Sequence, residues 1–441
     1  MISALTASSI YSTLGNSNSL VPMAIKDVAN SCGLTAGSYI TGDKLEGKDR
    51  FIDEFGTQAI WLFGIPAYKK IIDLTLYKLL KIDPKFDVRN LKYNRKSILK
   101  KSIEYADSSI KDSMKNAAKN INFTKNLALG KFIVSTVLTI VSYAGLTKFR
   151  HNLTKKSAQK EILAEINDSN LKNDKYGFTK PTWSFKSNSQ PSFTGGVQDF
   201  MYNPVKNLMI VDGAITTERL AHSRNKQDLI GYTIKEGTFW IFMYFASKPI
   251  QKYLENKAEK NTKKPVSIDL DARVIESKEL EKAFKDGSLK QSVKKVLELE
   301  TPEQLLDYIH NNPNDFTVKM AKMSDVIPVL KNANQADNVD YRKFIDFNEF
   351  KNIAKKLDKL NGKFDAFKLS DLHDKSLESF LKSVKKAKRI SVLKNIGACI
   401  GVLGVFAPVM MVLVRKMDKN NKGFQVKEDL KKEMNINEDL K

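Results

Sequence analysis

The sequence predicts an all-α integral membrane protein with an internal duplication. Three observations lead to this fold class: two apolar stretches long enough to cross a bilayer, two shorter apolar runs, and a set of motifs that recur in the same order. The chain has 441 residues, a length typical of two or three domains. Amphipathic helical patterns fill much of the remaining sequence.

Residues 127–147 and 395–414 are the two candidate full spans. A spanning helix needs about 20 mostly apolar residues, because a rise of about 1.5 Å per residue must cover about 30 Å of hydrocarbon. The second stretch has no charged residue, and Lys131 alone interrupts the first. Lysines flank both stretches on both sides, so the positive-inside rule gives no orientation. The alternative is that both are buried core helices.

Two shorter charge-free runs, 55–68 and 237–247, hold corresponding places before the spans. Runs of this length are more often re-entrant or interfacial than spanning, so we predict two short re-entrant or interfacial helices. If they are re-entrant, each copy crosses the membrane once and the copies are inverted. If they span, each copy crosses twice and the copies are parallel.

Four colinear matches suggest the duplication. Residues 40–45 resemble 215–220, and a glycine-threonine pair follows Glu54 and Glu236. An aromatic run ending near a proline comes next in each half, and residues 86–89 resemble 270–273. Each match is weak alone, but all four occur in the same order in both halves, and this shared order suggests a duplication.

Two helix boundaries can be predicted in the second half of the chain. A helix should begin at Thr301, because a hydroxyl cap, a proline and a glutamine follow one another with capping-box spacing. Another should end at Gly362.

The predicted organisation has seven segments. The segments are a flexible tail (1–37), the first copy (38–166), a polar linker (167–200), the start of the second copy (201–275), an inserted soluble helical subdomain (276–375), a basic amphipathic helix with the last span (376–416) and a polar tail (417–441).

The net charge of +23 favours anionic partners, namely anionic lipid headgroups or nucleic acid. A lysine-rich composition bias explains part of it, because the positive charge is spread along the chain. Nucleic acid is the weaker candidate, since basic and aromatic residues are not interleaved. The predicted anionic-lipid contacts lie on the basic helix before the last span: Lys382, Lys385, Lys386, Lys388, Arg389 and Lys394.

The sequence carries no motif of a nucleotide-driven motor or a common hydrolase. The four histidines are isolated, so we predict no enzyme activity, no cofactor and no metal site. Residues 418–429 resemble an EF-hand loop, but Lys422 occupies a ligand position. No basic segment opens the chain, so we expect no cleavable signal peptide and insertion in the cell membrane.

Three residues form the candidate polar membrane site: Glu54, Lys235 and Glu236. Each glutamate stands at the start of a short apolar run. Helix capping is the simpler explanation, whereas paired, interrupted segments in two halves are typical of a transporter's binding site.

These features favour a membrane-anchored scaffold or interaction protein with an unidentified protein partner. The alternative is a transporter or channel for a small solute or ion, built from the two repeats and closed by homo-oligomerisation. A basic binder of nucleic acid or anionic lipid surfaces is the third hypothesis.

Overall fold

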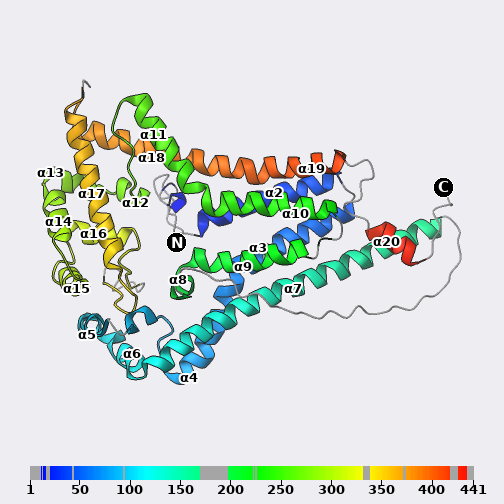
Figure 1. Cartoon of the computed structure of the whole chain (residues 1–441), viewed down its shortest axis with the longest axis horizontal. Helices are drawn as coiled ribbons and strands as arrows, with labels where there is room; N and C mark the ends of the chain where they lie inside the picture. Colours follow the sequence, from blue (N-terminus) through cyan, green and yellow to red (C-terminus); the bar gives the residue numbers. More distant parts are fainter. Residues whose placement is uncertain are drawn as a thin grey trace, which may run out of the picture. The chain divides into compact units, whose positions relative to one another are not determined.

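The structure is a computed structural model that describes residues 11, 13–15, 20–41, 44–92, 95–168, 197–221, 223, 226–330, 338–370, 374–417 and 426–434 (Figure 1). Helices make up its regular structure, and the described residues contain no strand beyond one isolated bridge between Val329 and Val339. The predicted all-α class is therefore confirmed.

The chain forms two compact units. We call the first the helical domain; it comprises Met1–Ile25, Lys69–Val134 and Phe242–Cys399. The second, which we call the bundle, comprises Lys26–Tyr68, Ser135–Ile241 and Ile400–Lys441.

Helices from both halves of the sequence form the bundle. In Figure 1, α10 runs alongside α19, and it also contacts α9 and η5. The helices that contribute to it are α2 (Val21–Thr41), α3 (Lys44–Ile72), the second part of α7 (Ile121–Asp168), α8 (Val197–Tyr202), α9 (Pro204–Ala221), α10 (Lys226–Trp240), η5 (Val402–Phe406), α19 (Ala407–Met417) and α20 (Val426–Glu433).

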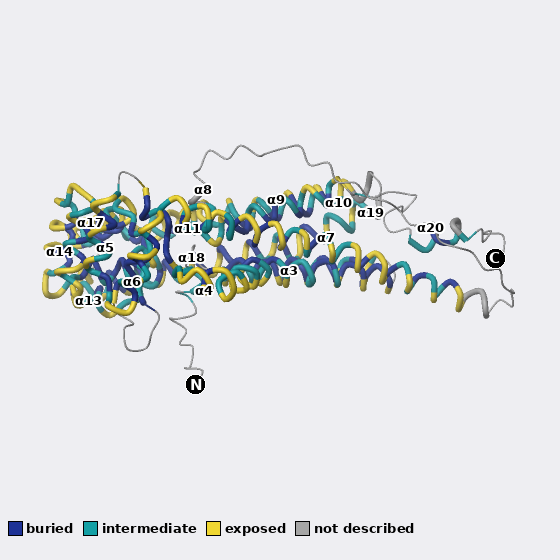
Figure 2. Tube along the Cα trace, turned by 90° about the horizontal axis from the view of Figure 1, so that it is seen from below, coloured by how far each residue is buried: buried dark blue, intermediate teal, exposed yellow. Residues whose placement is uncertain are grey.

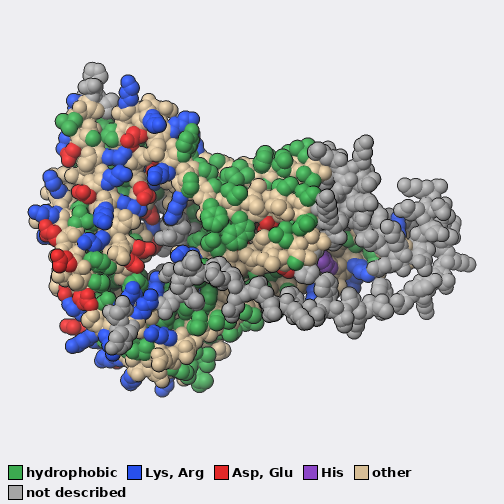
Figure 3. Space-filling model, in the orientation of Figure 1, with side chains coloured by type: hydrophobic (Ala, Val, Ile, Leu, Met, Phe, Trp, Pro, Cys, Tyr) green, Lys and Arg blue, Asp and Glu red, His purple; other side chains and the backbone are tan. Residues whose placement is uncertain are grey.

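Polarity is inverted in the bundle relative to a water-soluble protein. On α3, Asp53 and Glu54 are buried, whereas Phe51 and Phe63 are 50% and 67% exposed. Exposed positions recur along α3, α7 and α10 in Figure 2. In Figure 3 the visible face over α10 and α19 is mainly hydrophobic. Apolar surfaces of this extent mark contact with a membrane or a partner.

Two helices are long and apolar enough to cross a membrane: Ile121–Ala164 and Leu377–Val414. They contain the two stretches predicted as spans. Only 28% of the most apolar window is buried in each helix, whereas a core helix of a soluble protein would bury most of that window.

The two short apolar runs are not short helices, and this prediction was wrong. Residues 55–68 lie inside α3, which has 29 residues. Residues 237–247 run from α10 through a π-helical turn, η4 (Ile241–Phe245), into α11 (Ser247–Thr262). Charged residues such as Glu54 and Glu236 do not end these helices, because both are buried and paired inside the bundle.

Two glycines of the bundle, Gly33 and Gly404, lie where two helices approach too closely for a larger side chain. A methyl group on Gly33 of α2 would lie 2.0 Å from the carbonyl oxygen of Gly404 in η5. Gly404 is also four residues before Pro408, where a proline ring would collide with a regular helix. The π-helical turn η5 places its wider backbone at that point.

The helical domain contains the predicted inserted helices. Its elements are η1 (Asp73–Tyr77), α4 (Lys78–Leu80), η2 (Val88–Leu91), α5 (Lys96–Tyr105), α6 (Ser108–Lys119), the start of α7, η4, α11, α12 (Ala272–Glu276), α13 (Lys278–Lys285), α14 (Ser288–Leu297), α15 (Pro302–Asn311), α16 (Phe316–Met323), α17 (Phe347–Lys368) and α18 (Leu377–Gly401). The Thr301 capping box is confirmed. Asp307 on α15 accepts a hydrogen bond of 2.6 Å from Tyr105 and pairs with Lys101, both on α5.

Two predicted boundaries in the chain were wrong. Helix α17 passes Gly362 and ends at Lys368, because Phe367 is buried against Phe380 with ring centroids 5.3 Å apart. The predicted tail to residue 37 is helical from Val21, and Lys26 and Asp27 are already buried. The predicted linker 167–200 lies mostly outside the described residues.

The duplication remains a prediction. Asp87 and Asp271 share one local geometry: each accepts from the amide two residues on and pairs with that residue's guanidinium. Asp340 does the same with Arg342 outside the repeat, so this geometry is a general turn and does not establish common ancestry. Residues 215–220 lie inside α9, whereas Gly42 and Asp43 of the matching motif are outside the described residues.

Gly33→Ala should destabilise the bundle by about 1–3 kcal/mol, because backbone atoms cannot move aside as a flexible side chain can. Gly145→Ala on α7 is the matched control, since a methyl group there meets nothing within 4 Å. That control should be neutral, or stabilising by up to about 1 kcal/mol. Thermal unfolding in detergent measures both variants, and equal midpoints would contradict the close contact.

A buried charge network in the bundle

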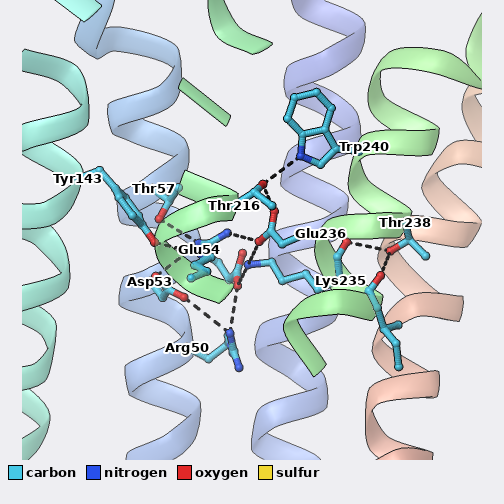
Figure 4. Close-up of polar contacts among 12 residues, drawn as sticks. Arg50, Asp53, Glu54, Thr57, Tyr143, Thr216, Lys235, Glu236, Thr238 and Trp240 are labelled. Atoms are coloured by element: carbon cyan, nitrogen blue, oxygen red, sulfur yellow. Dashed lines mark hydrogen bonds and ion pairs between the residues drawn. The ribbon is translucent and has the colours of Figure 1, made fainter. Parts of the chain in front are cut away.

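One face of α3 carries the polar centre of the bundle. Arg50, Asp53, Glu54, Thr57 and Gln58 follow one another at the three- and four-residue steps that place side chains on one side of a helix. Facing residues come from α7, α9 and α10 (Figure 4). The network therefore joins helices from both halves of the chain.

The shortest ion pair of this network joins the two halves. Lys235 Nζ on α10 lies 2.6 Å from Glu54 Oε1 on α3, and the two side chains are 2% and 4% exposed. The same nitrogen lies 3.6 Å from Glu236 Oε1. Arg50 reaches Glu54 Oε1 at 3.5 Å. Thus Glu54 has two cationic neighbours, and Lys235 lies between two carboxylates.

Arg219 on α9 holds the second carboxylate. Its Nη1 donates to Glu236 Oε1 at 2.7 Å, and its Nε donates to the Tyr143 hydroxyl at 3.0 Å. Thr216 donates to the other oxygen of Glu236 at 3.0 Å and accepts from Trp240 Nε1 at 3.0 Å. These contacts use both oxygens of the carboxylate and fix its orientation.

Arg150 on α7 extends the network toward the N-terminal end of α3. Its Nη1 lies 2.8 Å from Asp53 Oδ2, and its Nε lies 3.8 Å from Asp49 Oδ1. Asp53 also faces Arg219, with 3.5 Å between Oδ1 and Nη2. Thr154 donates to Asp49 at 2.8 Å. Isolated buried charges are strongly unfavourable, so the pairs must form together.

The structure brings the three predicted site residues together. Glu54, Lys235 and Glu236 lie in mutual contact through Lys235. Neither glutamate caps a helix: Glu54 lies ten residues into α3, and Glu236 ten residues into α10. The capping explanation therefore does not apply at either position.

Comparison with known protein families, curated proteins and solved structures gave no match.

Five charged residues of the network were absent from the sequence prediction: Asp49, Arg50, Asp53, Arg150 and Arg219. Two signals pointed to them. Arg50, Asp53 and Glu54 have helical spacing immediately before an apolar run, and Arg219 is the basic residue in the last turn of α9. The pairing of Arg150 with α3 has no local signal, since about a hundred residues separate the partners.

The structure corrects one of the predicted lipid contacts before the last span. Lys388 is buried, and its Nζ lies 2.9 Å from Glu255 on α11, so it does not reach a surface. Arg389 pairs with Glu276 at 2.6 Å. Lys382, Lys386 and Lys394 are exposed, and Lys385 is half-buried.

A basic cleft lies instead at the start of α7, within the helical domain. Its volume is about 470 Å³, and Lys92, Lys96, Lys119 and Lys125 line it. Asn120 accepts from the Phe123 amide in the first turn of α7. Four ammonium groups beside a helix N-terminus favour an anionic group.

Among the described residues, no group of three or more His, Cys, Asp and Glu side chains could hold a metal ion. The EF-hand-like loop begins at residues 418–425, which are outside the described residues. His310 stacks on Tyr105 with ring centroids 4.0 Å apart, and His151 contacts Arg150 at 3.1 Å.

Lys235→Met should cost about 3–5 kcal/mol of stability, because it leaves Glu54 with only the more distant Arg50 as a cationic partner. Adding Glu54→Gln should recover part of that loss, since the uncompensated charge is then removed. Thermal unfolding of the single and double variants in detergent measures this coupling.

Lys285→Met is the matched control, because Lys285 forms a 2.7 Å pair with Glu281 on an exposed face. Exposed pairs of this kind contribute about 0–1 kcal/mol. If Lys235→Met cost no more than Lys285→Met, the buried pair would not be stabilising the bundle.

Proposed function

We propose that this protein is an integral membrane transporter for a small ion or charged solute, with the buried charge network as its binding and coupling site. The observation that carries the proposal is the Lys235–Glu54 pair, which links the two halves of the chain inside a bundle with an apolar surface. The predicted homo-oligomer and location in the cell membrane belong to the same proposal.

Membrane insertion is supported by the inverted polarity of the bundle. Ile241 is 52% exposed, whereas Lys235 and Glu236 on the preceding turns are buried. In water this arrangement would expose apolar area and bury charge, both of which are unfavourable. In a bilayer the same arrangement is favourable for the outer face, and ionisable residues there normally face the interior.

A transporter explains the network better than a simple anchor does. An anchor needs only apolar helices, and each buried charge costs several kcal/mol before it is paired. Ionisable residues within membrane segments typically mark ion or proton pathways. Lys235 lies between Glu54 and Glu236 at 2.6 and 3.6 Å, so a small movement of its side chain would exchange its nearer partner.

The scaffold hypothesis keeps one specific support, the helical domain. Charged side chains gather over α13, α14 and α17 in Figure 3, and these helices suit contact with water or a protein partner. The domain also contains the basic cleft, which we propose contacts anionic lipid headgroups. Both activities are compatible with transport by the bundle.

The protein should remain in the membrane pellet after an alkaline carbonate wash, because the candidate spans lie in helices Ile121–Ala164 and Leu377–Val414. After reconstitution in liposomes, concentration jumps of H⁺, Na⁺, K⁺ or Cl⁻ on a solid-supported membrane should give a current for at least one ion. Glu54→Gln and Glu236→Gln should reduce that current to background.

Glu281→Gln is the control for these variants, because that glutamate lies on an exposed face of the helical domain. It should retain the wild-type current. Release by carbonate would contradict membrane insertion, and a wild-type current unaltered by either glutamine variant would remove the network from the transport site.

Replacing Lys92, Lys96, Lys119 and Lys125 together with glutamine should weaken binding to anionic lipid, with roughly 1 kcal/mol lost per lysine near the surface. Microscale thermophoresis of the detergent-purified protein with short-chain phosphatidylglycerol measures this effect, and phosphatidylcholine is the uncharged control. Replacing Lys285, Lys290, Lys294 and Lys295, on or near α14, should leave binding unchanged.

A further inference from the structure

The bundle buries more negative than positive charge. Among its described residues, the buried carboxylates outnumber the buried cations by two. Uncompensated charge in a medium of low dielectric constant is strongly unfavourable, so a buried carboxyl group either binds a proton or recruits a cation. The carboxylates are Asp27, Glu46, Asp49, Asp53, Glu54, Asp212 and Glu236, and the cations are Lys26, Arg50, Arg150, Arg219 and Lys235.

Asp27 on α2 is the carboxyl group with the weakest compensation. Glu54, Glu236 and Asp53 each have a cation within 3 Å. Asp27 forms no ion pair with any residue that the structure describes, although it is nearly buried. The charged groups around it are Glu54 on α3, Asp212 and Arg219 on α9, and Lys235 and Glu236 on α10.

A small, partly open cavity adjoins Asp27. The cavity measures about 20 Å³, and Asp27, Glu54, Gln58 and Trp61 are among its lining residues. A volume of this size holds one water molecule. Gln58 Nε2 and Trp61 Nε1 are buried and have no hydrogen-bond partner among the described groups. Two unsatisfied N–H donors therefore lie at a cavity that is also lined by four carboxyl groups, those of Asp27, Glu54, Asp212 and Glu236.

We propose that Asp27 carries a proton in the resting protein and that a water molecule in this cavity connects it to Glu54. The oxygen of that water accepts from the Asp27 O–H and from Trp61 Nε1, and one of its O–H groups donates to Glu54. Gln58 Nε2 at the same cavity is the donor that replaces the Asp27 O–H once Asp27 has lost its proton. This inference rests on the proposed function, because it names the coupling ion of the transporter as a proton.

A proton suits this site better than a metal cation. Sodium and divalent ions take oxygen ligands, whereas two of the groups at this cavity present N–H donors whose positive ends would repel a cation. A protonated carboxyl group adds positive charge without needing further ligands. It also needs no larger volume than the cavity provides.

Transfer through the water balances in atoms and charge. The Asp27 carboxyl group gives its proton to the water oxygen while the water gives one of its own protons to Glu54. Asp27 becomes a carboxylate, Glu54 becomes a neutral acid, and the water is regenerated. Neutral Glu54 attracts Lys235 less, so Lys235 is free to pair with Glu236, now 3.6 Å away. Proton transfer and rearrangement of the network are coupled in this way.

Infrared difference spectra of the full-length protein in lipid nanodiscs test the proposal. Between acidic and alkaline pH, the wild type should show a carboxylic-acid C=O band that disappears as one buried group loses its proton. Asp27→Asn should abolish that band. Asp112→Asn, at a carboxylate on an exposed face of α6, should retain it.

Trp61→Phe keeps the ring and removes one donor to the water. It should raise the pH at which half of the band has disappeared, because the water then stabilises the Asp27 carboxylate less. This variant also tests the proposal if Asp27→Asn fails to fold. An unchanged midpoint in Trp61→Phe would contradict the water bridge. A band that persists in Asp27→Asn would contradict protonation of Asp27, and a band that shifts when Na⁺ replaces K⁺ would contradict a proton as the bound ion. If the band behaves as expected while no ion drives a current, the proton site stands and the transport proposal falls.

Discussion

Charge neutralisation inside a bundle with an apolar surface is the constraint on which the rest of the structure depends. Lys235 and Glu54 illustrate it, since neither could be buried without the other. Each network residue on α3, α7, α9 and α10 has partners on another helix. The helices must therefore pack together for any one of them to be stable in its observed environment.

Packing around the network follows from this requirement. Large apolar side chains such as Trp61 and Leu403 are also buried in the bundle, and some of its close helix contacts are made at small residues. Gly33 and Gly404 provide one such contact, and Gly64 against Thr139 provides another. Such contacts are typical of membrane helices, where apolar burial between helices is a weaker driving force than in water.

Two cations of the network each lie between two carboxylates. Lys235 lies between two glutamates, and Arg219 lies between Glu236 and Asp53. An interior in which cations can exchange carboxylate partners suits a protein that responds to a proton or a charged solute. Ion pairs described in the helical domain, such as Lys388–Glu255, join two helices.

The sequence by itself determined the helical class, the two stretches long enough to span a membrane, the capping box at Thr301 and the positions of Glu54, Lys235 and Glu236. These depend on local periodicity and composition. The tertiary structure decided which charges meet, that α3 and α10 continue through their charged residues, and that Lys388 is internal. The physical reason is that a helix in the bundle can continue through a charged residue when that residue is paired with an opposite charge on another helix. The sequence does not show which residue is the partner, because the partner can be about a hundred residues away, as Arg150 is from Asp53.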